Sequence, residues 1–486
     1  MGTRRLYKER RREMLKRDKD QLALFENMMT KWVLNDLQGH VLINLKDYVD
    51  KICSLYNFEK YYSNLGRQAI SPRVMFGLLL LMEMGKLSNR QVTTACKANL
   101  LYKYFINLKP IEKVPDQSSI TTFKNRIGSE GLEELFNLLL DYCKELGLLK
   151  NNRVIDATHI QADISITGKR ELLRQSRKYV SKRMKDKSKS QELLEKYSSP
   201  KQKGKSSKEE IIKEIIKTEE YLKEALKADS SEEVKEAVHK IEEFLSEYKT
   251  GKNKIQSFVD EDARGGYKGP RKPFIGYKFH VSADPDSGLV TSTDLLGGNE
   301  NEGSHLLEII NKELSLGNKI DKIAADKLYG RFTDRNKLRE LNIEVAIPNR
   351  KERVMVSDFK FKDGVLTCSE GRSTSKYIEQ EGGLLFYFSV KHCKNCPKKN
   401  KCLSNKSTRK RVYLSYSRKE NLVSWENNKI FFKERYKIER IFGIGKKWMR
   451  LKNLVYRGYE NVRRFMILTF FTMNLKRLPK LIKTTT

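Results

Sequence analysis

The stretch Val154-Ile155-Asp156-Ala157-Thr158 decides the fold class that we predict for this chain. It lies within Arg153–Ile160, a run of apolar and β-branched residues that is typical of a buried strand. A carboxylate in such a run costs free energy unless a cation neutralises it. Two further segments set one acid in a similar context: Ala324-Ala325-Asp326-Lys327-Leu328-Tyr329, and Arg435-Tyr436-Lys437-Ile438-Glu439 with Lys446 beyond it. We interpret the three acids as candidate ligands of divalent metal ions.

The hydrophobic pattern around these acids predicts an α/β domain. Strand-like and helix-like periods alternate, and the turn Asp284-Pro285-Asp286-Ser287-Gly288 separates two of the strands. The expected elements are strands at Arg153–Ile160, Tyr277–Ala283 and Leu289–Leu296, a helix at Gly303–Leu314, a strand at Lys322–Tyr329, a helix at Thr333–Leu341 and a strand at Glu344–Pro348. Three strands, a helix, a strand, a helix and a strand is the order of an RNase H-like core, with the acids at strand ends.

Residues 1–150 predict an all-helical domain that precedes this core and opens with a basic arm at residues 1–20. An apolar helix runs from Ser71 to Gly85, and Ser88 is a good N-cap for a second helix. Helix, short turn, helix is the outline of a DNA-binding helix-turn-helix, although many helical bundles share it. The residues expected on the exposed face of the second helix are Arg90, Gln91, Thr94 and Lys97.

A charged segment at residues 169–255 interrupts the core after the first aspartate. It is dominated by Lys, Glu and Ser, and capping boxes at Ser207 and Ser230 open two amphipathic helices. We expect a helical hairpin preceded by a basic stretch. A solvated arm is the interpretation that we favour, and contact with DNA or with a second subunit is the alternative.

A second segment, residues 350–416, is turn-rich with short strands and contains four cysteines. Cys393-x₂-Cys396-x₅-Cys402, with Cys368 upstream, supplies enough thiols for tetrahedral Zn²⁺, and His392 is a substitute ligand. Reduced thiols without a metal are the competing interpretation. The remaining cysteines lie in apolar helical patterns and are expected in the core: Cys53, Cys96 and Cys143.

The core is expected to consist of residues 151–168, 256–349 and 417–486. In the last of these, a long helix runs through Glu439 and a final amphipathic helix covers Glu460–Leu478. On a helix, Arg435, Glu439 and Lys446 share one face, because their positions differ by only tens of degrees at about 3.6 residues per turn. A surface Arg–Glu pair is the simpler interpretation of the first two.

The charge balance indicates a phosphate-rich partner. The 486 residues contain 97 Lys and Arg against 62 Asp and Glu, a net charge of +35. A ribosomal-type RNA binder or a merely basic enzyme would share this composition. The N-terminus lacks the apolar core of a signal peptide, and the longest apolar runs are too short to cross a bilayer. We therefore expect a cytoplasmic protein that binds nucleic acid and no membrane.

The motif Arg435-x₃-Glu439-x₆-Lys446 resembles the Y-R-E-K signature of the DDE transposases of bacterial insertion sequences. Val154–Thr158 and Ala325–Gly330 resemble the first and second aspartate boxes of that family. The resemblance covers nearly the whole chain and is strongest to the subgroup with a helical insertion after the first aspartate. One position departs from the pattern, because Phe432 stands where the family has Tyr.

The resemblance implies an RNase H-like core in which Asp156, Asp326 and Glu439 bind two Mg²⁺ ions, which Mn²⁺ can replace. Arg435 and Lys446 would hold the backbone of the transposon end. The implied activity is binding of terminal inverted repeats, cleavage of donor DNA and joining of the 3′-OH ends to target DNA, by a homodimer associated with the bacterial nucleoid. The alternative is a non-catalytic basic DNA-binding protein derived from a transposase.

Overall fold

The computed structural model describes residues 31, 34–63, 68–164, 168–199, 207–251, 255, 257–268, 272–348, 359–380, 383–404, 407–452 and 454–485. The expected basic arm at residues 1–20 lies outside these ranges. Within them, no helix combines the length and the apolar content that crossing a bilayer requires.

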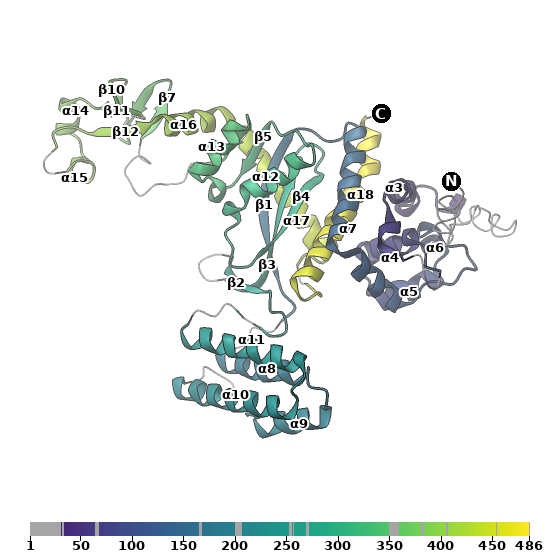
Figure 1. Cartoon of the computed structure of the whole chain (residues 1–486). Coiled ribbons are helices and arrows are strands. Elements are labelled where there is room, and N and C mark those ends of the chain that lie inside the picture. The colour runs from purple at the N-terminus through teal and green to yellow at the C-terminus, as the bar shows by residue number, and fades with distance from the viewer. Residues whose placement is uncertain are drawn as a thin grey trace, which may run out of the picture.

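A mixed sheet forms the centre of the molecule (Figure 1). Its strands are β1 (Asn152–Gln161), β2 (Arg264–Tyr267), β3 (Pro273–Ala283), β4 (Val290–Gly297), β5 (Lys322–Ala325) and β6 (Glu344–Ala346). The order is β2-β3-β1-β5-β6, and β4 also pairs with β3, along Tyr277–Ala283, which follows the part of β3 that pairs with β2. β3 is antiparallel to β1 and β4, whereas β1, β5 and β6 are parallel. This order and these directions are consistent with the RNase H-like core that the sequence predicts.

The second aspartate lies just beyond its strand. The expected strand Lys322–Tyr329 is too long, because β5 ends at Ala325. The side chain of Asp326 then accepts a hydrogen bond from the Leu328 backbone N–H at 2.5 Å and begins the 3-10 turn η3 (Lys327–Tyr329). The capped turn therefore holds Asp326 at the end of the sheet's parallel half.

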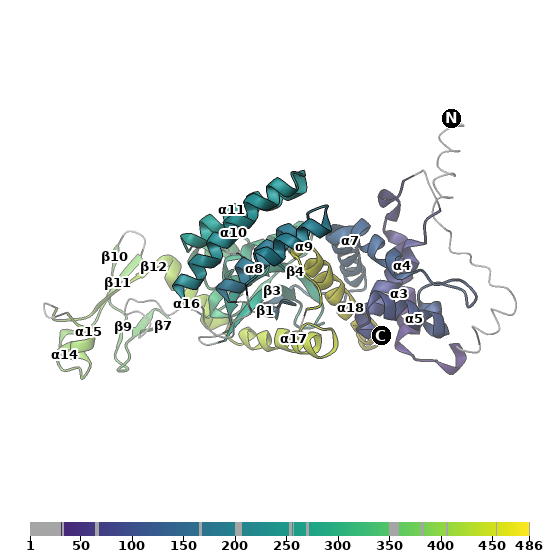
Figure 2. The same cartoon turned by 90° about the horizontal axis from the view of Figure 1, so that it is seen from below.

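Helices cover both faces of the sheet. On one face, α12 (Leu306–Ser315), which follows the short turn η2 (Glu302–Ser304), and α13 (Phe332–Glu340) share a buried core with β1, β5 and β6. On the other face, α17 (Tyr436–Trp448) packs against β1 and α18 (Tyr459–Thr485) against β4 (Figure 2). The long helix expected through Glu439 is wrong, since it divides into α16 (Tyr416–Asn428), the 3-10 turn η4 (Phe431–Arg435) and α17.

The N-terminal helices pack on the far side of α18 (Figure 1). They are α3 (Val41–Leu55), the turn η1 (Phe58–Tyr61), α4 (Pro72–Gly85), α5 (Asn89–Ala98), α6 (Leu100–Phe105) and α7 (Gln117–Glu145). The predicted helix-turn-helix outline is confirmed at α4 and α5, and Ser88 forms a capping box with Gln91. One buried cluster runs from these helices through α18 to the sheet, so the helical region has no separate core.

The charged segment after β1 contains four helices, not the expected two. They are α8 (Lys169–Ser181), α9 (Lys187–Lys196), α10 (Lys208–Ala228) and α11 (Glu232–Lys249), and they share a hydrophobic core of their own. The predicted hairpin is present as α10 and α11, but the prediction was incomplete because the basic stretch before it is itself helical. Arg177 of α8 is buried there and donates to the Thr218 hydroxyl at 2.7 Å and to the Glu214 carboxylate.

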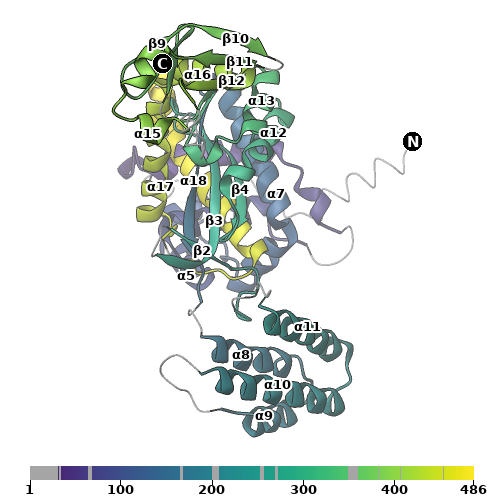
Figure 3. The same cartoon turned by 90° about the vertical axis from the view of Figure 1, so that its left-hand side faces the viewer.

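The cysteine-containing segment contains β7 (Lys360–Lys362), β8 (Val365–Thr367), β9 (Ser373–Thr374), β10 (Tyr377–Gln380), β11 (Gly383–Tyr387), α14 (Val390–Lys394), α15 (Lys399–Cys402) and β12 (Arg411–Ser415). Two three-stranded sheets, β7-β8-β9 and β10-β11-β12, enclose a small core. In Figure 3 this segment and the four-helix segment lie at opposite ends of the molecule.

Candidate active site

The strand pairing brings the two aspartates together. Ile155 of β1 is opposite Ala325 of β5 in the parallel register, so Asp156 is the next residue of β1 and Asp326 is the residue that directly follows β5. Burial raises the pKa of Asp156 to about 6, the Ala157 backbone N–H and Arg435 lower it, and the neighbouring charge of Asp326 raises it further. The carboxylates are therefore close enough to repel each other, which a cation between them would relieve.

Arg435 joins the third acid to the first. Its guanidinium donates from Nη1 to Asp156 Oδ2 at 2.9 Å and from Nη2 to Glu439 Oε1 at 2.8 Å. Arg435 ends η4 and Glu439 lies in the first turn of α17. The two side chains therefore still meet, as predicted, although the helix is not continuous between them. The Phe432 ring lies 6.0 Å from the guanidinium carbon, where it packs against the arginine. Arg435 thus links Glu439 to Asp156, and the strand register sets Asp326 beside Asp156, near the middle of β1 where its pairing with β5 stops.

Lys446 also lies near the candidate acids, close enough to Asp156 for their charges to interact. It is half-buried; burial and the positive charge of Lys268 lower its pKa, and Asp156 raises it. Its neighbour Lys447 accepts a hydrogen bond from Lys86 Nζ at its backbone carbonyl, at 2.9 Å. Because Lys86 lies in the turn between α4 and α5, the helix-turn-helix outline contacts the helix that carries Glu439 and Lys446.

Sequence reasoning missed a second group of residues around the aspartates. Glu302 of η2 accepts from Lys278 Nζ at 2.6 Å, and its negative charge contributes to the raised pKa of Asp156. Tyr329 is fully buried between these groups, and burial raises its pKa well above the ordinary value. His280 stacks on Tyr329 with ring centroids 5.6 Å apart. The only signal in the sequence was polar residues inside an alternating strand, which does not reveal contacts across the sheet.

His280 is buried without a hydrogen-bond partner for either ring nitrogen among the described residues. Burial lowers the pKa of His280 to about 3, and the nearby His305 lowers it further, so the ring is neutral. A neutral ring adds no positive charge to the carboxylate cluster.

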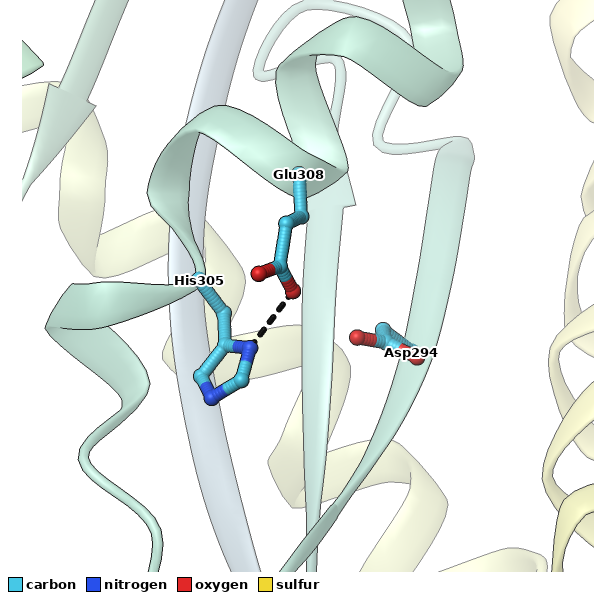
Figure 4. A group of neighbouring side chains, drawn as sticks. All are labelled: Asp294, His305 and Glu308. Carbon is cyan, nitrogen blue, oxygen red and sulfur yellow. Dashed lines mark hydrogen bonds and ion pairs between the residues drawn. The ribbon is translucent and has the colours of Figure 1, made fainter.

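A separate group of possible metal ligands lies on β4 and α12 (Figure 4). The ligand atoms of Asp294, His305 and Glu308 all lie within 4.8 Å of one another. His305 Nδ1 is 2.6 Å from Glu308, and its Nε2 is 3.2 Å from Glu300. An ion pair therefore joins two of the three residues, and the group shares no member with Asp156, Asp326 and Glu439.

Comparison with known proteins identifies the family. A family profile described as "Transposase domain (DUF772)" matches residues 33–126, and one described as "Transposase DDE domain" matches residues 246–475. The chain belongs to the DDE-type transposases. This membership assigns it to DNA transposition, which is a form of DNA recombination.

Two further similarities are more limited. The "Uncharacterized protein ORF8 in nfe locus" of Rhizobium meliloti is 30% identical over 92 residues, which are 18% of this transposase and 44% of that protein. The cryo-EM structure of a piggyBac transposase synaptic complex with hairpin DNA covers 92% of this transposase and 77% of that chain, at 9% identity and a TM-score of 0.29.

Three of the predicted DNA-contacting residues of the transposase lie on α5, whereas Arg435 and Lys446 lie near the candidate acids. Arg90, Gln91 and Lys97 are all exposed, as the helical period predicts. The Gln91 side chain already accepts from the Ser88 backbone N–H at 2.9 Å, because it completes the capping box. Arg90 and Lys97 therefore offer free-ended cationic side chains on this surface, while Gln91 has a structural task.

The four predicted zinc ligands of the transposase lie around one small cavity. Cys368, Cys393, Cys396 and Cys402 line it together with His392. All four are free, half-buried thiols, whereas Cys53, Cys96 and Cys143 are buried in the helical core as the sequence predicts.

Proposed function

We propose that this transposase binds the terminal inverted repeats of an insertion sequence, cleaves the donor DNA and joins the 3′-OH ends to target DNA. The observation that carries the proposal is the placing of Asp156 beside Asp326 by strand register and its link to Glu439 through Arg435. The four helices between β1 and β2 support assignment to the subgroup with a helical segment after the first aspartate.

The three acids suit a pair of Mg²⁺ ions. Mg²⁺ prefers carboxylate oxygens and shares them with phosphate and water, and Mn²⁺ accepts the same ligands. The raised pKa of Asp156 reflects a buried carboxylate whose charge is only partly compensated, which is the condition that a cation would relieve. When bound, two ions would activate the attacking oxygen and stabilise the leaving oxygen of the phosphodiester.

Arg435 and Lys446 have complementary tasks in this scheme. Both are long cations that reach the carboxylate cluster, and both can contact a phosphate of the DNA backbone. Arg435 cannot donate fully to Asp156 and to a phosphate at once, so we infer that it turns towards the DNA when the acids bind metal. Phe432 packs on it in place of the family's Tyr and offers no hydroxyl to the backbone.

The strongly basic chain and the exposed α5 support binding of duplex DNA outside the active site. The net charge of +35 favours phosphate contacts of any sequence, and Arg90 and Lys97 would add contacts from a helix-turn-helix. Processing two transposon ends requires at least two active sites, so we propose a homodimer on DNA.

The test is cleavage and joining of DNA that carries the inverted repeats flanking this gene, in the presence of Mg²⁺. Asp156→Asn, Asp326→Asn and Glu439→Gln should each lower cleavage and joining by at least a thousandfold and change end binding by only a few fold. Glu308→Gln alters the separate acidic group and serves as the matched control, with activity close to wild type. Full cleavage by any of the three variants would reject the assignment, and a wild-type chain that binds ends without cutting them would leave only the non-catalytic alternative.

A further inference from the structure

Three separate segments bring the four half-buried cysteines to one point. Cys368 follows β8, Cys393 lies in α14, Cys396 follows α14, and Cys402 ends α15. They line a cavity of about 40 Å³, which is large enough for an ion. Burial raises the pKa of Cys402, Lys410 lowers it, and the nearby Cys393, Cys396 and Cys368 raise it, as expected for thiols that lie close to Cys402.

The backbone around these thiols is shaped to present sulfur. Cys368 opens a tight turn in which its N–H donates to the Arg372 carbonyl at 2.8 Å and Gly371 donates back to the Cys368 carbonyl at 3.0 Å. Gly371 has φ +72°, which favours glycine. The Lys410 backbone N–H donates to Cys393 Sγ at 3.4 Å, an interaction that stabilises a thiolate.

The charge around the cavity suits a metal-thiolate centre. Four thiolates and one Zn²⁺ carry a net charge of −2. Arg372, Lys399 and Lys410 line the same cavity and offset that charge. Protonated thiols without a metal would have no negative charge for these three cations to offset.

The hydrophobic core beside the cysteines is small for the segment it must support. It consists of Phe359, Phe361, Leu366, Leu384, Phe386, Phe388, Val412 and Leu414. The strands around it have two to five residues each, and Cys368, Cys393 and Cys402 pack against it. Modules of this size usually need a metal or disulfide to supplement the core, and the four cysteines are free.

We propose that Cys368, Cys393, Cys396 and Cys402 bind one structural Zn²⁺. Four thiols each lose a proton and four sulfur–zinc bonds form, without any change in oxidation state. Zinc–sulfur bonds of about 2.3 Å place the sulfurs roughly 3.8 Å apart in a tetrahedron. Among the described residues, no three of these sulfurs lie within 4.8 Å of one another, so binding of the ion requires the cysteine side chains to move closer together.

The zinc centre would stabilise the part of the chain that leads into the candidate active site. Leu422 of α16 packs against the small core, and α16 also contacts β6 of the central sheet. α16 leads directly into η4 and Arg435. Fixing the cysteine segment therefore limits the motion of the chain that carries Arg435 and Glu439.

Zinc content of the full-length protein, purified under reducing conditions, tests the proposal. We expect about one zinc atom per chain by plasma mass spectrometry, and less than a tenth of that in Cys393→Ser and Cys396→Ser. Cys143→Ala, which removes a buried thiol of α7, should keep the wild-type content. Zinc retained by both serine variants, or lost equally from Cys143→Ala, would overturn the assignment.

A second test titrates the thiols of the wild-type protein, so its result does not depend on whether a variant folds. Stepwise addition of a mercurial reagent should release one zinc per four thiols modified, detected with a colorimetric zinc indicator. Limited proteolysis within residues 359–415 should accelerate at least tenfold after release. The proposal would be contradicted if wild-type protein that has been supplied with zinc binds none. It would also be contradicted if the protein binds iron instead, seen as an absorbance band in the visible region.

Discussion

At the scale of single residues, Arg435 is the cation that pairs with two of the candidate acids. Its guanidinium donates to Asp156 at 2.9 Å and to Glu439 at 2.8 Å, so it partly neutralises two of the three acids. A metal ion that binds these carboxylates has to compete with the arginine. The contact therefore offsets part of the cost of the acids' charge, and in the function that we propose it also weakens metal binding before DNA arrives.

Arg435→Ala should tighten binding of Mn²⁺ to the DNA-free protein. The two charge-assisted hydrogen bonds are partly exposed, and losing about 1 kcal/mol of competition corresponds to a roughly three- to tenfold gain in affinity. Isothermal titration calorimetry measures it. Arg440→Ala removes the same charge from an exposed position in α17, the helix that follows Arg435, and is the control. Affinity no higher in Arg435→Ala than in Arg440→Ala would show that the arginine does not compete with metal.

The candidate residues of this site were predictable to different degrees. The sequence predicted Asp156, Asp326, Glu439, Arg435 and Lys446, because each lies in a local motif with a defined spacing. It did not predict Glu302 or His280, which approach the site only through the pairing of β3 with β1 and the packing of η2 and η3. Contacts made by strand register between distant segments leave no local signature.

At the scale of elements, a buried ion pair joins the central strand to α12. Arg153 Nε donates to Glu313 Oε2 at 2.6 Å, and their side chains are 2% and 0% exposed. Thr291 of β4 donates to the other carboxylate oxygen at 2.8 Å. The pair thus connects β1, β4 and α12 at the end of the sheet where β1 begins. The sequence predicted these elements but not the pair, because 160 residues separate its members.

Glu313→Ala should destabilise the transposase by about 3–5 kcal/mol, because the buried Arg153 would keep its hydrogen bonds to the Lys150 and Asn152 carbonyls but lose the carboxylate that balances its charge. Thermal unfolding followed by circular dichroism measures the loss as a lower midpoint. Glu308→Ala, on the exposed side of the same helix, should change stability by less than about 0.5 kcal/mol. The double substitution Arg153→Met with Glu313→Leu should recover most of the stability. A cost below about 1 kcal/mol for Glu313→Ala would mean that the pair is solvated.

Element boundaries were the less predictable part of the fold. The breaks after Ala325 and before Tyr436 depend on a capped turn and a 3-10 turn, which interrupt continuous apolar patterns. The helices α8 and α9 were missed because their charged residues hide a narrow apolar face, including Leu172, Leu173 and Val180. That apolar face is buried only because α10 and α11 pack against it.

At the scale of the whole molecule, the C-terminal helix unites the N-terminal helices with the sheet. α18 packs against α3, α4 and α7 on one side and β4 on the other, and Phe76 meets Phe471 edge to face at 5.2 Å. The sequence predicted both regions but not their shared core, since nothing local shows that the last helix lies between them. The helix-turn-helix outline is therefore held rigidly relative to the candidate active site.

This shared core contains an acid that should make stability depend on pH. Burial raises the pKa of Glu83 to about 7, while Lys124, Arg450 and a hydrogen bond from Thr469 of α18 lower it. The folded protein keeps a proton on Glu83 between its unfolded pKa of 4.5 and about 7, where the unfolded chain has lost it. This contribution to stability is therefore present at low pH and is lost as the pH rises through this window.

Glu83→Gln should remove that part of the pH dependence. The wild type should lose on the order of 3 kcal/mol from this group between pH 5 and pH 8, and the variant should not. Melting temperatures of both proteins across that range provide the measurement, with the exposed Glu236→Gln of α11 as control. Parallel curves for wild type and Glu83→Gln would show that the carboxyl ionises freely in the folded state.

The central claim is that the three acids form a metal site, and the anomalous scattering of Mn²⁺ in crystals of the transposase bound to DNA of its inverted repeats tests it most directly. We predict anomalous peaks between Asp156 and Asp326 and beside Glu439, with Arg435 displaced towards a phosphate, and no such peaks in Asp326→Asn. Peaks confined to Asp294, His305 and Glu308, with none at Asp156 and Asp326, would contradict the account.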